Sequence, residues 1–187
     1  MKPFILGING SPHVKGVGAQ LLEEALDGCL STGAETLTYH LVDPLNGYVQ
    51  GEYRDTTPPG LELLFEQILR ADGIIFSTPT YWFNMSALMK SLMEYLTNLE
   101  LRKFALEGKV AGLIATCKED GAQGTLSLMA APLVHMGFLL PPYSMVFRNT
   151  KMADKSENNW QKEDILLLGQ NVVQLVNLVK ETSWGYE

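Results

Sequence analysis

The chain has 187 residues, of which 46% are hydrophobic and 19% are charged, a balance typical of globular proteins rather than of disordered chains. Its net charge of −7 argues against sequence-independent binding to nucleic acid, which needs lysine and arginine to neutralise phosphates. Its two cysteines, far apart in the sequence, indicate reduced thiols rather than a disulfide framework and exclude a four-thiolate metal site built from one chain. A chain of this length suits one domain, so we expect residues 1–187 to form a single domain.

The N-terminus begins with a short strand-like run at residues 4–9, without the longer apolar core of a signal peptide. No apolar run in the sequence reaches the roughly 18 residues that a transmembrane helix needs. The sequence therefore predicts a cytoplasmic protein that does not use a membrane as a partner.

Short β-rich runs alternate with longer helical ones along the chain, which is typical of repeated strand–helix units on a parallel sheet. The expected strands are 3–9, 36–42, 73–77, 110–116 and a fifth within 138–147. The expected helices are 17–31, 59–71, 84–99, 123–136 and 160–182. Segments 43–58 and 148–159 are polar or rich in glycine and proline, so we expect them to be loops.

This order of elements leaves two common folds, a dinucleotide-binding Rossmann sheet and a flavodoxin-like sheet. Five strands in 187 residues favour the second: a doubly wound α/β fold with a five-stranded parallel sheet, strand order 2-1-3-4-5 and helices on both faces. Ligands of such sheets bind at the carboxyl ends of the strands, where the strand order reverses. The loops after the first, third and fourth strands are therefore the candidate site.

The first of these loops, residues 9–18, is built of small residues and leads into a helix. Free backbone amides and the positive end of a helix dipole suit a phosphate there. Ser11 can add a hydroxyl, and His13 and Lys15 can add charge. The loop lacks the Walker A and dinucleotide-binding patterns, and a plain strand-to-helix turn is the alternative interpretation.

The second loop carries three consecutive aromatic residues, Tyr81, Trp82 and Phe83. Three adjacent aromatic side chains are hard to bury together, so we expect at least one to line a cleft where a planar ligand stacks. A core or subunit contact is the alternative. Asn84 or Ser86 can cap the next helix. The third loop, residues 116–124, is a polar turn that can form another wall of the same pocket.

These loops resemble those of the NAD(P)H-dependent FMN reductase family, which is related to multimeric flavodoxin-like and iron–sulfur flavoproteins. The resemblance spans residues 3–141. Its anchors are Gly10-Ser11-Pro12, Ser77-Thr78-Pro79-Thr80-Tyr81-Trp82 with Met85-Ser86 and Lys90, and Leu106-Glu107-Gly108-Lys109.

The resemblance implies FMN as cofactor and NAD(P)H as co-substrate. The residues that it implies for the FMN phosphate are Ser11, His13, Gly16, Gly18, Ala19 and Gln20. Those that it implies for the isoalloxazine and ribityl groups are Pro79, Thr80, Tyr81, Trp82, Phe83 and Asn84, with Thr116, Cys117, Gly121 and Gly124 beside the ring.

Two of the loops depart from the family pattern. Arginine or lysine usually stands where this chain has His13, and a hydroxyl residue usually stands where it has Gly18. The third loop is usually rich in glycine, whereas this chain has Lys118, Glu119 and Asp120. The iron–sulfur branch carries a compact group of cysteines after the second strand. Residues 43–57 of this chain contain no cysteine, so we expect no iron–sulfur cofactor.

The resemblance implies an oxidoreductase that passes electrons from a nicotinamide through FMN to a small acceptor such as a quinone or free flavin. The flavin performs the redox chemistry, and the protein supplies binding and orientation, so no catalytic acid–base residue is assigned. The resemblance to a family whose members often form oligomers, together with the exposed aromatic residues, indicates a homodimer or homotetramer. The alternatives are a flavodoxin-like binding or assembly protein with weak or lost FMN binding and an electron-carrier flavodoxin.

Overall fold

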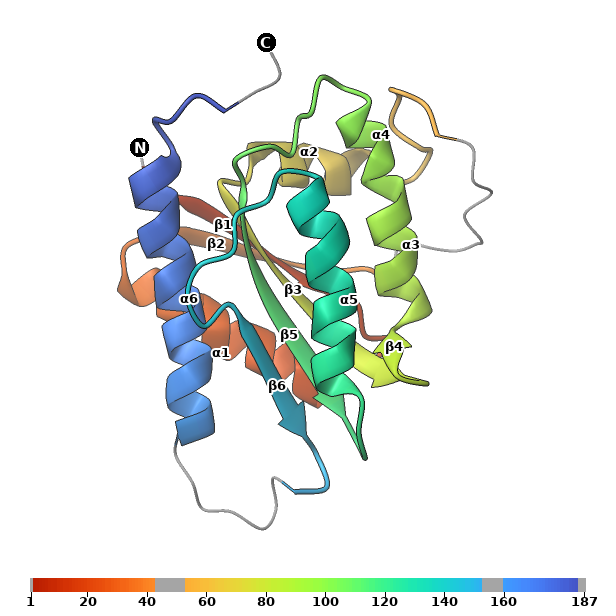
Figure 1. Ribbon diagram of the computed structural model, residues 1–187, viewed down its shortest axis with the longest axis vertical. Coiled ribbons are helices and arrows are strands. Elements are labelled where there is room, and N and C mark those ends of the chain that lie inside the picture. Colours follow the sequence, from red (N-terminus) through yellow and green to blue (C-terminus); the bar gives the residue numbers. More distant parts are fainter. Residues whose placement is uncertain (1, 43–52, 153–159, 185–187) are drawn as a thin grey trace.

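The computed structural model describes residues 2–42, 53–152 and 160–184 (Figure 1). Its strands are β1 (Phe4–Asn9), β2 (Glu35–His40), β3 (Gly73–Tyr81), β4 (Asn84–Met85), β5 (Val110–Cys117) and β6 (Met145–Asn149). Its helices are α1 (Val17–Ser31), α2 (Glu62–Arg70), α3 (Ala87–Tyr95), α4 (Thr97–Glu100), α5 (Ala122–His135) and α6 (Trp160–Val179).

The sheet has the predicted topology. Its strands pair in the order β2-β1-β3-β5-β6, all in parallel, which is 2-1-3-4-5 when only the parallel strands are counted. The prediction of a flavodoxin-like α/β fold is thus confirmed. One short strand was not predicted: β4 pairs antiparallel with the end of β3.

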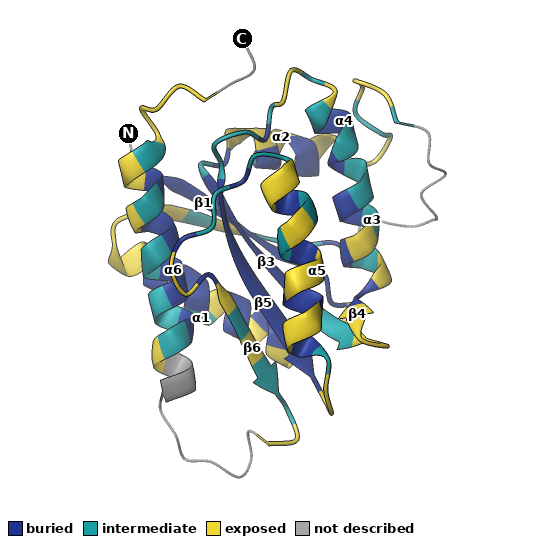
Figure 2. Cartoon of the chain, viewed as in Figure 1, coloured by how far each residue is buried: buried dark blue, intermediate teal, exposed yellow. Residues whose placement is uncertain are grey.

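Two hydrophobic cores lie on the two faces of the sheet, because successive side chains of a strand point to opposite faces. Ile5, Ile75 and Ile114 point to the core that α1 and α6 cover. The other core contains the residues next to them in the strands, such as Leu6 and Phe76, and is covered by α2, α3, α4 and α5. Figure 2 shows the strands buried between the two helical layers.

Helices α1 and α6 cross with their backbones in contact at two glycines. A Cβ atom added to Gly169 would lie 1.9 Å from the carbonyl oxygen of Ala25, and one added to Gly28 would lie 2.3 Å from that of Leu166. The Cys29 thiol at this crossing donates a hydrogen bond to the Gly169 carbonyl oxygen at 3.3 Å. Burial raises the pKa of Cys29 to about 12, so this cysteine acts as a packing residue.

Two predicted boundaries were wrong. The helix expected over 84–99 begins only at Ala87, because Asn84 and Met85 pair with β3. The fifth parallel strand runs to Asn149 rather than ending by 147, so Arg148 and Asn149 lie in a strand instead of the predicted loop. Most of the predicted loops 43–58 and 148–159 lies outside the described residues.

Candidate functional site

The first loop is held in shape by its own side chains. The Oδ1 atom of Asn9 accepts a hydrogen bond from the Ser11 amide at 3.1 Å, and the Ser11 hydroxyl oxygen accepts one from the His13 amide at 3.1 Å. The His13 carbonyl oxygen then accepts one from the Gly16 amide at 3.0 Å. Asn9 and Ser11 are buried, whereas His13 and Lys15 are exposed. The loop is therefore preformed up to the start of α1.

The start of α1 has backbone donors that no described residue uses. Gly16 is the N-cap and provides no side chain, and the first turn contains no acidic residue. The amides of residues 17–19, including those of Gly18 and Ala19, have no hydrogen-bond acceptor among the described residues. The Gln20 amide was expected to face a phosphate but donates to the Gly16 carbonyl oxygen at 3.1 Å. Three unpaired amides at the positive end of a helix suit an anion.

Gly18 lies where α1 packs closely against the sheet. The Ser77 hydroxyl donates to the Gly18 carbonyl oxygen at 2.8 Å, and a Cβ atom added to Gly18 would lie 3.2 Å from the Ser77 Oγ atom. The Thr116 Oγ1 and Cγ2 atoms would both lie 3.9 Å from that Cβ atom. The limited space next to β3, rather than a left-handed backbone conformation, therefore explains why glycine occupies this position.

The second loop is a tight β-hairpin. Strand β3 continues to Tyr81, the chain reverses at Trp82 and Phe83, and Asn84 pairs with Tyr81. Trp82 has a φ angle of 50° and Phe83 one of 62°, as the central residues of a two-residue type I′ turn require. Such turns favour Asn-Gly, and bulky residues adopt positive φ only at a cost. The hairpin thus holds two aromatic residues in an unfavourable backbone conformation.

The tip of this hairpin presents its aromatic side chains to solvent and also contacts the third loop. Trp82 is 96% exposed, Phe83 65% and Tyr81 47%. A Cβ atom added to Gly121 would lie 2.7 Å from the Phe83 Cδ1 atom. Gly121 also has a φ angle of 89°, so contact and backbone conformation both require glycine at this position.

Ser86 joins the base of the hairpin to the first loop. Its hydroxyl donates to the Gly10 carbonyl oxygen at 2.6 Å and accepts from the Met89 amide at 3.1 Å, so Ser86 caps α3. Its amide donates to the Thr78 hydroxyl at 3.1 Å. Asn84, the other predicted cap, instead accepts a hydrogen bond from the Met85 amide. The two loops therefore form one hydrogen-bonded unit.

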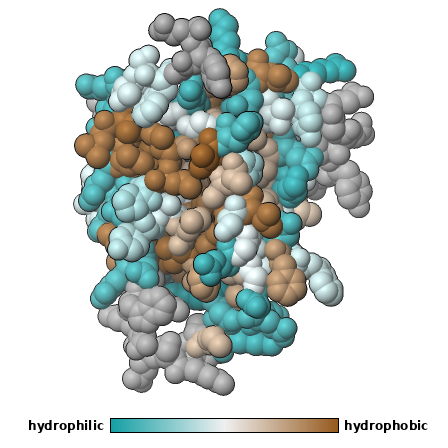
Figure 3. Space-filling view, in the orientation of Figure 1, coloured by the Kyte–Doolittle hydropathy of each residue, from teal (hydrophilic) through white to brown (hydrophobic). Residues whose placement is uncertain are grey.

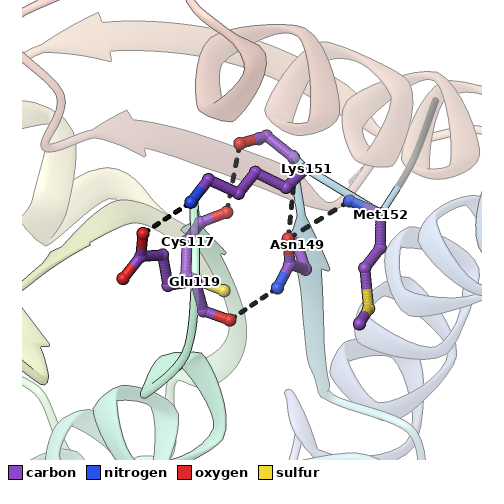
Figure 4. Close-up of polar contacts among 6 residues, drawn as sticks. Cys117, Glu119, Asn149, Lys151 and Met152 are labelled. Atoms are coloured by element: carbon purple, nitrogen blue, oxygen red, sulfur yellow. Dashed lines mark hydrogen bonds and ion pairs between the residues drawn. The ribbon is translucent and has the colours of Figure 1, made fainter.

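The third loop is fastened to the end of β6 (Figure 4). The Asn149 side-chain amide donates to the Glu119 carbonyl oxygen at 2.6 Å, and the Thr150 amide donates to the Cys117 carbonyl oxygen at 2.8 Å. Lys151 forms an ion pair with the Glu119 carboxylate and lowers its pKa. The negative charge of Glu119 thus has a partner within the protein.

The remaining predicted residues of this edge differ in accessibility. Thr116 and Cys117 are buried, with 8% and 7% of their surfaces exposed, and Gly124 lies exposed in the first turn of α5. Burial raises the pKa of Cys117, which keeps its sulfur in the thiol form. Pro79 and Thr80 are half-buried, and the Thr80 hydroxyl oxygen is buried without a hydrogen-bond partner among the described residues.

Comparison with known protein families gives a match over residues 3–151 to the model described as NADPH-dependent FMN reductase. The chain belongs to this family.

Individual relatives agree with the assignment. An iron–sulfur flavoprotein of Methanocaldococcus jannaschii is 29% identical over 95% of this chain and 99% of that protein. An NAD(P)H-dependent FMN reductase of Pseudomonas aeruginosa is 30% identical, over 59% of this chain and 57% of that protein. The crystal structure of RosB with bound 8-demethyl-8-formylriboflavin-5′-phosphate has a TM-score of 0.79 and 18% identity, covering 97% of this chain and 82% of RosB.

Family membership makes this protein an FMN-dependent oxidoreductase with a nicotinamide nucleotide as reductant. Its own residues fit the cofactor: the start of α1 offers unused amides, Thr80 offers an unpartnered buried hydroxyl, and the hairpin offers exposed aromatic rings. A cluster held by four thiolates cannot be built from this chain alone, because the chain has two cysteines.

Two further findings concern the described ranges 2–42, 53–152 and 160–184. No helix there is both long enough and apolar enough to cross a membrane, and no group of three or more potential metal-binding side chains occurs there.

Ser77 was not among the predicted site residues. It joins α1 to β3 although it lies 59 residues from Gly18. The only sequence signal was a small polar residue at the end of an otherwise apolar strand.

Proposed function

We propose that this protein binds FMN along the carboxyl edge of the sheet and passes electrons from NAD(P)H, through the flavin, to a small acceptor such as a quinone or free flavin. One observation carries the proposal. The amide-rich start of α1 and the exposed aromatic hairpin follow neighbouring parallel strands, and the hydrogen bond from Ser86 to Gly10 joins them. The proposed phosphate site would thus lie beside the proposed surface for a planar ring.

The first loop would hold the FMN phosphate through the Ser11 hydroxyl and the amides of residues 17–19, with His13 and Gly16 beside them. An anion there gains from hydrogen bonds to unpaired amides and from the helix dipole. Because the loop already has its shape, binding costs little ordering of the backbone.

The hairpin and the third loop would hold the rest of the flavin. Tyr81, Trp82 and Phe83 supply aromatic surface for stacking, and the Thr80 hydroxyl has an unused hydrogen-bonding capacity. The other residues assigned to this region are Pro79, Asn84, Thr116, Cys117, Gly121 and Gly124. Bound FMN would supply the redox chemistry, whereas these residues orient it and limit access to it.

Two measurements test the proposal. Titration of FMN with the protein should quench flavin fluorescence by stacking on the hairpin, and binding should raise the melting temperature. Stopped-flow mixing of the loaded protein with NAD(P)H should bleach the flavin absorbance, and a quinone should restore it. Unchanged fluorescence and melting temperature would favour the binding or assembly alternative. Reduction by dithionite but not by NAD(P)H would favour an electron carrier.

We also propose a homodimer or homotetramer in the cytoplasm, and both statements stay predictions. A surface that supports assembly is the apolar area over α6 and toward α5 in Figure 3. Leu178 is 78% exposed, and Met145 and Phe147 are each 47% exposed. Light scattering coupled to size-exclusion chromatography measures the assembly, and a monomer at micromolar concentration would contradict it.

A further inference from the structure

Arg148 lies near the carboxyl end of β6, on the face of the sheet that α1 and α6 cover. It pairs in register with Thr116 of β5. Val146, two residues earlier in β6, packs against the core beneath α1 and α6. Because side chains alternate between the faces of a strand, Arg148 points to that same face, together with Thr116.

The start of α1 lies on this face as well. Ser77 of β3 is hydrogen-bonded to Gly18, and Thr116 of β5 would be 3.9 Å from a Cβ atom at that position. Strand β6 is the next strand after β5, and neighbouring strands lie about 4.8 Å apart. An arginine side chain on β6 can therefore extend past Thr116 to the first turn of α1.

Arg148 is half-buried, and one atom of its guanidinium is buried without an acceptor within the described ranges. Its Nε atom is buried and has no hydrogen-bond partner there, although buried polar groups almost always have one. The acidic groups near the third loop are already engaged: Glu119 with Lys151, and Asp120 with the Gly121 amide. A buried Nε donor with no acceptor among the described residues, next to helix amides that are also unused there, indicates an anionic ligand.

We propose that Arg148 is a phosphate-binding residue of this protein, which supplies from β6 the fixed positive charge that the first loop lacks at His13. The inference rests on the proposed function, because the phosphate is that of FMN. A guanidinium suits this role, since it stays charged and can donate two parallel hydrogen bonds to phosphate oxygens. A local cation also offsets the net charge of −7, which otherwise disfavours an anionic ligand.

The test compares FMN with riboflavin, which lacks the phosphate, in fluorescence titrations of the wild type, Arg148→Met and Arg148→Lys. Arg148→Met should weaken FMN binding by about tenfold to a hundredfold, as expected for a hydrogen bond to a charged group, and leave riboflavin binding unchanged. Arg148→Lys keeps the positive charge but cannot donate two parallel hydrogen bonds, so the affinity of this variant for FMN should be intermediate. The matched control is Arg70→Met, which removes an arginine that contacts Phe4 and Glu35 and should leave both affinities unchanged.

A second readout separates binding from a structural role. Because the Nε atom has no described partner to lose, Arg148→Met without flavin should melt at or above the wild-type temperature. A lower melting temperature together with equal losses for both flavins would overturn the inference, as would unchanged FMN affinity.

Two other outcomes also decide the matter. Weaker discrimination between NADPH and NADH, with an unchanged ratio of FMN to riboflavin affinity, would assign Arg148 to the nicotinamide nucleotide and overturn the inference. If the wild type bound neither flavin, the proposed function would fail and this inference with it, whereas FMN binding that does not depend on Arg148 would overturn this inference alone.

Discussion

The first loop and the aromatic hairpin follow neighbouring strands of one sheet, yet they are built in opposite ways. Asn9, Ser11 and Ser86 are buried and fix the first loop by hydrogen bonds. The hairpin is hydrogen-bonded at its base and packs against Gly121 at its tip, where Trp82 and Phe83 are exposed in a costly backbone conformation. In the proposed binding mode, preformed donors hold the phosphate, whereas apolar surface exposed to solvent holds the planar ring.

This contrast makes a general prediction about the two flavins. Changes in the first loop should alter binding of FMN and leave riboflavin unaffected, because only FMN carries the phosphate. Changes at the hairpin tip should alter binding of both equally. The variants below test or refine the contrast.

The largest expected effect is that of Ser86→Ala. This variant removes the cap of α3 and leaves the buried Gly10 carbonyl oxygen unpaired, which should lower the free energy of unfolding by about 2–4 kcal/mol. Asn84→Ala is the control, because Asn84 is exposed and, among the described residues, its side chain bonds only the adjacent Met85 amide. Its effect should be about 0.5 kcal/mol or less. Urea unfolding measures both, and equal losses would show that Ser86 does not join the two loops.

Gly18→Thr should also destabilise the protein, although a hydroxyl usually stands there in the family. Its Cβ atom would lie 3.2 Å from the Ser77 Oγ atom, and overpacking of this kind costs about 1–3 kcal/mol. Ser77→Ala removes that oxygen, so the double variant should lose less than the sum of the single losses, by about 0.5 kcal/mol or more. A double-mutant cycle from urea unfolding measures the coupling, and strict additivity would contradict this packing explanation.

Replacing Trp82-Phe83 by Asn-Gly should stabilise the flavin-free protein while it weakens flavin binding. Asn-Gly suits positive φ, so the unfolding free energy without flavin should rise by about 1 kcal/mol or more. The loss of stacking should weaken FMN and riboflavin equally, by about 0.5–1.5 kcal/mol. Trp184→Ala is the control, because Trp184 contacts Gly108, far from the hairpin in the sequence, and should leave flavin binding unchanged. A selective loss of FMN would mean that the hairpin contacts the phosphate.

The smallest expected effect concerns Cys117, whose pKa is raised by burial. The folded protein holds this thiol proton to a higher pH than the unfolded chain does, so alkylation by iodoacetamide at pH 8 should be slow. The rate should increase when the pH is raised or urea is added, and mass spectrometry can follow it. Fast labelling at pH 8 in the absence of urea would show that the third loop opens away from β6.

The sequence predicted the sheet and α1 well because both depend on local patterns. Short apolar, β-rich runs between helical segments mark the buried strands. Helix α1 was predicted over 17–31, where the structure has it. The three loops were also identified correctly as neighbours, since parallel strands place their carboxyl ends at one edge.

What the sequence could not predict depends on contacts between distant residues. Trp82 and Phe83 are poor residues for a tight turn, so no local signal indicated β4, and pairing with β3 had to override propensity. The extension of β6 to Asn149 depends on hydrogen bonds to Glu119 and Cys117 in another loop. The reason for Gly18 became visible only when Ser77 was found against it.

The crossing of α1 and α6 has a consequence for the evolution of this enzyme. Gly28 and Gly169 fix the helices at backbone contact, and Gly28 lies ten residues after Gly18, or about 15 Å along the axis of α1. A methyl group added at the crossing would push the helices apart and tilt α1, so that its amide-bearing end moves relative to the sheet. A directed-evolution search for altered cofactor affinity should therefore recover substitutions at this pivot as well as in the loops.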